Sequence, residues 1–191
     1  VYTAGAHGTI IGTLNQLVPY GEDAESVRAI PDNGYVFERW SDGVLNARRS
    51  DKNVKEDISV TANFTLASYN VRFYNRNGDL ISSQQVISGG QPQVPQTGFE
   101  AEGFDFLGWI VKGEGSEADF SKITSNIDFI ASYKSKQYEV FFYDLEGNIT
   151  NALICDHGDS VIPPQAAELY GYQFSKWIIK GTENTAVFNN I

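Results

Sequence analysis

Few side chains in this 191-residue sequence could perform acid–base or metal chemistry, and they include only two histidines and one cysteine. Cys155 and His157 lie close together in the segment Cys155-Asp156-His157-Gly158-Asp159. A cysteine, a histidine and nearby carboxylates could bind a metal ion, and a histidine could activate the thiol as a nucleophile. On a β-strand, Cys155 and His157 would project from the same face. This segment is therefore the first candidate for a chemical site.

Similar segments elsewhere in the chain argue against a site at His157. The residue that precedes a strand-closing glycine is Tyr20, Ser88 and His157 in three comparable places. A position that accepts a tyrosine, a serine and a histidine is typical of a strand end rather than of a catalytic or metal-binding group. His7 precedes a glycine in a predicted hairpin, and we interpret it as a turn residue. The sequence therefore predicts no catalytic residue, no cofactor and no metal site.

The other signatures of catalysis are missing from the sequence. It contains no phosphate-binding loop, dinucleotide fingerprint, nucleophile elbow or HExxH helix. Aspartates such as Asp42 and Asp79 stand beside glycine in predicted turns, where the backbone favours both residue types. No calcium-binding D-x-D-x-D-G spacing occurs. We therefore predict that the chain is not an enzyme.

The composition excludes several further classes of protein. Lysine and arginine number 14 against 24 aspartates and glutamates, so the formal net charge is −10 and no nucleic-acid partner is expected. No run approaches the roughly 18 apolar residues of a membrane span, so this segment is not expected to insert into a membrane. Hydrophobic residues make up 41% and aromatic residues 13%, which excludes intrinsic disorder. A single cysteine excludes a disulfide framework.

One heptapeptide pattern, G-[YF]-x-F-x-x-W, occurs three times, at residues 34–40, 103–109 and 171–177. Its tryptophans are 69 and then 68 residues apart, and this nearly fixed period indicates an internal repeat. In a unit of about 67 residues, burial of three aromatic side chains could supply much of a small core. The predicted core of the repeats consists of Tyr35, Phe37 and Trp40, of Phe104, Phe106 and Trp109, and of Tyr172, Phe174 and Trp177.

Alternation of apolar and polar residues around the heptapeptide predicts four strands in each unit. The heptapeptide itself forms the third strand. The other predicted strands are first strands at 69–74 and 138–143, second strands at 80–87 and 149–155, and closing strands at 57–64 and 126–133. The crossover has room for one short helical turn at most, at residues 165–170 after Pro164. The sequence thus predicts a mostly β fold, α+β in each unit, with a short helix or none.

The chain divides into three predicted units, at residues 1–66, 69–134 and 138–191. The linkers 67–68 and 135–137 are short, which predicts closely strung beads with restricted freedom. Ile191 aligns with Ile123, so the third unit lacks a counterpart of the closing strand. Because an open sheet edge recruits strands, we expect the third unit to be less ordered than the second, or to be completed by another copy of the chain or by residues 1–3.

The second and third units share an opening Y-x-V-x-F, a turn with glycine, a loop with proline and the heptapeptide. In these features they resemble the Listeria–Bacteroides repeat, also called the internalin B-repeat. The first unit resembles the divergent version of that repeat, with Ala4-Gly5-Ala6-His7-Gly8-Thr9-Ile10 and Trp40-Ser41-Asp42-Gly43 in the corresponding places. The resemblance implies β-grasp-like (ubiquitin-like) units in a secreted or cell-wall-associated bacterial surface protein. It also implies a spacer or adhesion role, with a protein or glycan at a cell surface as partner.

Three functions remain open, and the third, an enzyme, would be favoured by a cleft that gathers His157 with two carboxylates. The first is a non-enzymatic surface module that extends a larger protein and contacts a partner. The alternative is a carbohydrate-binding accessory module of a secreted enzyme, because exposed aromatic rings stack on sugars. The heptapeptide spacing favours a core role for the three tryptophans, whereas Tyr20 and Tyr170 lie outside it and are expected to be exposed. An exposed line of Tyr or Trp on one unit would favour the alternative.

Overall fold

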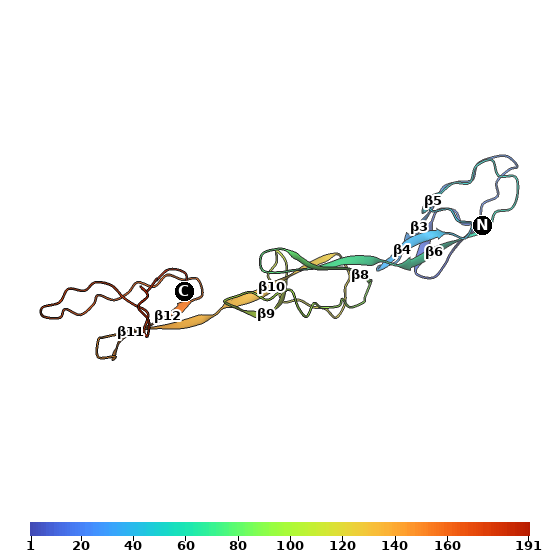
Figure 1. The fold of residues 1–191 in the computed structure, drawn as a ribbon. Coiled ribbons are helices and arrows are strands. Elements are labelled where there is room, and N and C mark those ends of the chain that lie inside the picture. Colours follow the sequence, from blue (N-terminus) through green and yellow to red (C-terminus); the bar gives the residue numbers. More distant parts are fainter.

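The computed structural model describes residues 1–191 as an elongated molecule of three β units placed end to end (Figure 1). All of its regular structure consists of twelve strands, which confirms the predicted mostly β class. Residues 165–170, which have room for one short helical turn at most, form none, so the α+β description of each unit is not confirmed. No helix of the chain is long and apolar enough to cross a membrane.

The first unit is built from two three-stranded sheets. One sheet has the order β1-β6-β4, with β1 parallel and β4 antiparallel to β6, and the other has the antiparallel order β2-β3-β5. The strands are β1 (Tyr2–Ala4), β2 (Gly8–Ile11), β3 (Val27–Pro31), β4 (Tyr35–Trp40), β5 (Arg48–Arg49) and β6 (Val60–Leu66). The heptapeptide of this unit forms β4, as its alternating pattern predicts.

The second unit is one four-stranded sheet with the order β8-β7-β10-β9. Its strands are β7 (Ser68–Tyr74), β8 (Leu80–Ile87), β9 (Phe104–Val111) and β10 (Ile127–Ser135). The closing strand β10 lies inside the sheet, parallel to β7 and antiparallel to β9. The side chains of Phe73 and Phe129 are fully buried, because the alternating strands place their apolar residues on the face that the long loops cover.

The third unit contains only one hairpin, formed by β11 (Gln137–Tyr143) and β12 (Ile149–Asp156). Its heptapeptide at 171–177 forms no strand, although the sequence predicts one there. In the other two units this segment pairs with the closing strand, and the described residues of the third unit contain no such partner. The strand prediction is therefore wrong for a physical reason, since a strand's backbone groups need a neighbour.

A shared loop relates the three units despite these differences. In each unit, a glycine after the second strand donates its N–H to the carbonyl of a distant residue at 2.7 Å. The N–H of that distant residue donates in turn to the carbonyl of the residue that follows the glycine. The glycine–carbonyl pairs are Gly21–Val54, Gly89–Ile123 and Gly158–Ile191. The loop thus places Ile191 in the third unit where Ile123 lies in the second.

Each core centres on the tryptophan of the heptapeptide and an aromatic residue of the first strand. The exposed fraction is 0% for Trp40 and 8% for Trp109, and Trp177 is half-buried. The three pairs make edge contacts, with ring centroids 5.9 Å apart for Tyr2–Trp40, 4.9 Å for Phe73–Trp109 and 5.1 Å for Phe142–Trp177. Edge-to-face pairs of this kind add about 0.5–1.5 kcal/mol to the burial of the rings.

The remaining aromatic residues of the heptapeptide are less buried than expected. Tyr35, Phe37 and Phe104 are half-buried, and Phe106 is exposed on one side while it touches Phe99, Trp109 and Tyr133. In the third unit the expected core positions Tyr172 and Phe174 are 81% and 58% exposed. They lie outside the core because no strand within residues 138–191 holds this segment against β11.

Candidate functional site

The junctions between the units are continuous β-strands rather than flexible linkers (Figure 1). Only Ala67 separates β6 from β7, and only Lys136 separates β10 from β11. The predicted linkers of two and three residues therefore shrink to one residue each. These short connections agree with the expectation of closely strung units with restricted freedom.

The single residue at each junction is hydrogen-bonded to both of the units that it joins. The Ala67 N–H donates to the Gly34 carbonyl of the first unit at 2.9 Å, and the Ala67 carbonyl accepts from the Ser88 N–H of the second unit at 2.7 Å. Lys136 repeats this arrangement, donating to Gly103 at 2.9 Å and accepting from His157 at 2.8 Å. Each junction thus has its backbone groups satisfied on both sides.

The glycine that opens the heptapeptide has a second role at these junctions. A Cβ at Gly103 would lie 1.9 Å from the His157 ring, and a Cβ at Gly34 would lie 2.7 Å from the Ser88 Oγ. Both glycines also have positive φ angles, of 76° and 84°. The residue before the closing glycine therefore packs directly onto the preceding unit, in a space that only a glycine leaves open.

His157 is consequently a junction residue, and no hydrogen bond joins its imidazole to the Cys155 thiol, which bonds to the Tyr138 carbonyl instead. The imidazole makes edge contacts with two aromatic rings. Its centroid lies 5.5 Å from that of Phe104 in the second unit and 6.0 Å from that of Tyr138. Cys155 is buried in the core of the third unit, near the Tyr138 carbonyl. No group of three or more His, Cys, Asp or Glu side chains is arranged to hold a metal ion.

His7 lies in the turn between β1 and β2, which confirms its interpretation as a turn residue. Its φ angle of 70° is in the left-handed region. Its ring stacks on that of Tyr35, with the two ring centroids 4.1 Å apart. This contact joins the β1–β2 turn to the heptapeptide strand β4. The arrangement stabilises the turn and brings no acid or base to the imidazole.

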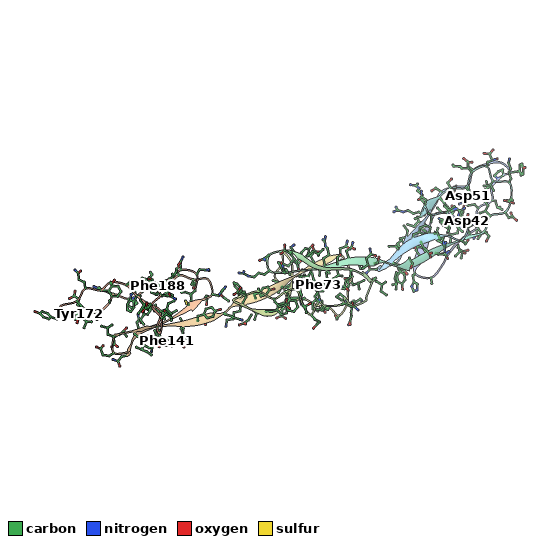
Figure 2. All side chains as sticks on the ribbon, viewed as in Figure 1. Asp42, Asp51, Phe73, Phe141, Tyr172 and Phe188 are labelled. Atoms are coloured by element: carbon green, nitrogen blue, oxygen red, sulfur yellow. The ribbon has the colours of Figure 1, made fainter.

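A buried arginine in the first unit is the main polar feature that the sequence does not predict. Arg49 is only 8% exposed and lies between Asp42 and Asp51, which are labelled in Figure 2. Its guanidinium donates two hydrogen bonds to Asp42, at 3.0 and 2.9 Å, and two to Asp51, at 3.2 and 2.6 Å. The same group lies 5.1 Å from the centre of the Trp40 ring. The arginine thus links the β5 turn to the core tryptophan.

Tyr2 explains why this network occurs in one unit only. Tyr2 packs on the tryptophan as Phe73 and Phe142 do in the other units, but its hydroxyl is buried and needs a partner. The hydroxyl donates to Asp51 at 2.7 Å. Burial, and then this hydrogen bond to an anion, raise the pKa of Tyr2 to about 12. A tyrosine at a position that holds phenylalanine in the other two units is the only sequence signal for the network.

Comparisons with known families now define the units. Residues 1–68 match the divergent InlB B-repeat domain, and residues 69–132 match the Listeria-Bacteroides repeat domain. Residues 1–132 thus comprise one domain similar to the divergent InlB B-repeat and one similar to the Listeria-Bacteroides repeat. No curated protein matches it. Repeat domains of this type typically occur in surface proteins and are generally non-catalytic modules.

The matched ranges have consequences for the three units. They end and begin at the β6–β7 junction, so the first two B-repeats are consecutive domains joined through Ala67. Neither match extends over residues 138–191. The assignment of that segment as a third B-repeat stays a prediction, supported by its hairpin, its loop at Gly158 and its Phe142–Trp177 pair.

The Arg49 network should make the first B-repeat sensitive to acid. Hydrogen bonds from Arg49 lower the pKa of Asp42; burial opposes the charged form of Asp51, but hydrogen bonds from Arg49 and Tyr2 outweigh it and lower that pKa too. A carboxyl group whose pKa is lowered by folding stabilises the folded state. This contribution is fully present when the pH is above the group's ordinary pKa of 3.8. That contribution is lost as the pH falls through the lowered folded values.

We therefore expect the amides of β6 to lose hydrogen-exchange protection below about pH 4, before those of β10. The measurement is native-state hydrogen exchange of the whole chain over a series of pH values. An Asp42→Asn, Asp51→Asn variant is the control, because it should be less stable at neutral pH and show a flatter dependence on pH. If β6 were equally sensitive to acid in the wild type and in this variant, Asp42 and Asp51 would not be the cause of the acid sensitivity.

Proposed function

We propose that this chain is a non-enzymatic spacer and interaction segment of a larger bacterial cell-surface protein. The observation that carries the proposal is the continuous strand path through both junctions. A module that must hold a partner-binding region away from a cell surface gains from joints that do not bend. One doubly hydrogen-bonded residue per joint, packed by Ser88 or His157 against glycine, meets that need.

The sheet of the second B-repeat supports a β-grasp-like unit as part of this proposal. Its order β8-β7-β10-β9 places two parallel strands in the centre, and each has an antiparallel partner on its outer side. A first hairpin, a crossover and a second strand pair give this order, with a loop in place of the helix. The chain therefore enters and leaves the unit on adjacent central strands, which suits end-to-end stacking.

A carbohydrate-binding role has weaker support. Tyr20 and Tyr170 are exposed, as a sugar-stacking role needs, but they lie on different units. Tyr170 and Tyr172 share the third unit, in a segment that pairs with no strand of residues 138–191. On the second unit, the Arg76 guanidinium lies 3.7 Å from the centre of the Phe104 ring, so one face of that ring is covered. No line of exposed rings lies on a single complete B-repeat, and the spacer role is preferred.

The spacer proposal predicts one fixed distance between neighbouring units. We would attach spin labels at Glu38→Cys and Glu114→Cys, both exposed, in a Cys155→Ala background. Pulsed electron paramagnetic resonance should give one narrow distance distribution. A Gly-Ser-Gly-Ser insertion after Ala67 should broaden it at least twofold, because it separates the paired hydrogen bonds of the junction.

The control is the same four-residue insertion at Gly78, in the exposed β7–β8 turn, which should leave the distribution narrow. A distribution that is already broad without any insertion would overturn the spacer proposal. A narrow distribution that survives the insertion after Ala67 would show that contacts other than the junction residue fix the two units.

A further inference from the structure

One edge of the sheet in the second B-repeat is formed by β8, which pairs with β7 and has no strand on its other side. The Ser88 N–H donates to the Ala67 carbonyl, so every second residue of β8, counted back from Ser88, bonds to β7. The residues between them face away from β7, and no other segment bonds to the backbone of Ser83 or Gln85. Their N–H and C=O groups are therefore free to pair with an added strand.

A groove lies beside this edge, between β8 and the loop that follows it. Its volume is about 490 Å³, and its lining residues are 81–84 of β8 and 93–97 of the loop. No charged side chain lines the groove, and most of the lining side chains carry a hydroxyl or an amide group. Such groups both donate and accept hydrogen bonds. A ligand of this groove should therefore be uncharged and able to make hydrogen bonds.

The side chain of Gln84 holds the loop beside β8. Its amide donates to the Gln93 carbonyl at 2.7 Å and accepts from the Gln93 N–H at 2.8 Å, and we call this pair the amide clamp. The loop is thus tied to the sheet through a side chain, and the backbone edge of β8 stays open. Near Thr97, Gly98 lies so close to Ile81 that a Cβ would come within 3.2 Å of that side chain. The wall of the groove is therefore held in place before a ligand binds.

The second unit alone combines an amide clamp with a strand edge. In the first unit, Gln16 holds the Glu25 backbone in the same way, at 2.8 and 3.1 Å, but residues 12–20 form no strand. In the third unit, β12 is a strand, but Leu153 and Ile162 occupy the clamp positions, counted from the closing glycine, and leucine has no amide. An open edge beside a held groove is therefore particular to the second B-repeat.

We propose that this groove is a binding site for an extended, uncharged peptide of a partner protein, which adds as a further strand to the outer edge of β8. The peptide backbone pairs with Ser83 and Gln85, and its alternate side chains enter the groove. Those side chains are small and carry hydroxyl or amide groups that match the lining. A charged side chain would leave water without gaining an ion pair, since no lining residue is charged. The proposal rests on the interaction part of the proposed function and names its ligand class.

The test uses the whole chain and a fluorescein-labelled peptide with blocked termini, Thr-Val-Thr-Gln-Thr-Val-Thr. We expect saturable binding in fluorescence anisotropy. In hydrogen exchange, saturating peptide should slow the amides of Ser83 and Gln85 roughly tenfold or more. The amides of Ala152 and Ile154, on the outer side of β12, should not change, because no held groove lies there.

Two control peptides test the backbone pairing and the preference for uncharged side chains. One has two adjacent central prolines, which remove backbone donors whichever way the peptide pairs. The other has aspartate in place of two threonines that share one face. Each should bind roughly tenfold more weakly or worse, the loss expected for one or two hydrogen bonds.

Variants of the chain separate strand addition from non-specific adhesion. Gln84→Leu introduces the residue of the third unit, opens the amide clamp and should weaken binding roughly tenfold. The neighbouring Gln85→Leu keeps the clamp and should bind as the wild type does. Ser83→Pro removes an outward N–H at a strand edge, where proline is tolerated, and should abolish binding. Unchanged hydrogen exchange of Val71 and Phe73 would show that each variant keeps its fold.

The proposal is overturned if the peptide does not slow Ser83 and Gln85, if the control peptides bind equally well, or if Gln84→Leu binds like the wild type. It is also overturned if maltoheptaose slows these amides and the peptide does not, because the groove is then a sugar site. Protection that rises with chain concentration without peptide would overturn it as well, because a second copy then occupies the edge. A broad distribution in the spin-label experiment would overturn the spacer role and leave this peptide site standing.

Discussion

Replacing Trp109 with alanine should lower the free energy of unfolding of the second B-repeat by about 3–5 kcal/mol. Trp109 is 8% exposed, and its ring contacts those of Phe73, Phe99 and Phe106. The substitution removes the largest side chain from a core whose fully enclosed members are few. A loss of this size is a large part of the stability of a small domain.

The measurement is urea unfolding of the whole chain, followed by hydrogen exchange of β7 and β10 so that the second unit is resolved from its neighbours. Leu107→Ala is the matched control, because Leu107 lies on the same strand and is exposed. It should change stability by less than about 0.5 kcal/mol. A loss below 1 kcal/mol for Trp109→Ala would show that the tryptophan contributes a surface contact, and would raise the carbohydrate alternative.

Replacing Arg49 with alanine should destabilise the first B-repeat by about 3 kcal/mol. The change removes four charge-assisted hydrogen bonds and leaves Asp42 and Asp51 beside each other without a cation. Removing one partner of a buried ion pair is costly because the other charge stays away from water. The loss should be at the lower end of the usual range, since the Asp42 side chain is 40% exposed.

Thermal unfolding with hydrogen exchange of β6 would measure this loss, and two further variants would identify its cause. Arg48→Ala is the control, because Arg48 is the exposed neighbour on β5. Arg49→Lys keeps the charge but not the fork that reaches both carboxylates, so its stability should lie between those of the wild type and the alanine variant. If lysine restores full stability, charge alone matters and the hydrogen-bond geometry does not.

The strands could be predicted from the sequence because their signal is local. Residues 69–74 and 80–87 alternate apolar and polar side chains on either side of a glycine turn, and β7 and β8 occupy these places within one residue. The repeated tryptophans also predict the cores, because a small unit buries its largest apolar side chains in its single core. In these respects pattern and structure agree.

The sequence could not predict the features that depend on distant partners. Arg49 meets the Tyr2 ring and the Asp42 carboxylate only after three segments have folded together, and no periodicity relates them. Residues 171–177 match those of β9 but form no strand, because residues 138–191 include no strand that pairs with them. His157 was placed at a strand end, but its contact with Gly103 crosses between units and has no local signal.

The position of the parallel strands has a mechanical consequence. The chain enters the second B-repeat at the start of β7 and leaves it at the end of β10, and these adjacent parallel strands have those points at opposite ends. Tension applied along the molecule therefore pulls the two strands past each other, in shear. The hydrogen bonds between them must then break together rather than one after another, and the Arg72–Asp128 pair is loaded with them. β1 and β6 have the same geometry in the first B-repeat, so a pulling force meets such a shear-loaded pair in both of these domains.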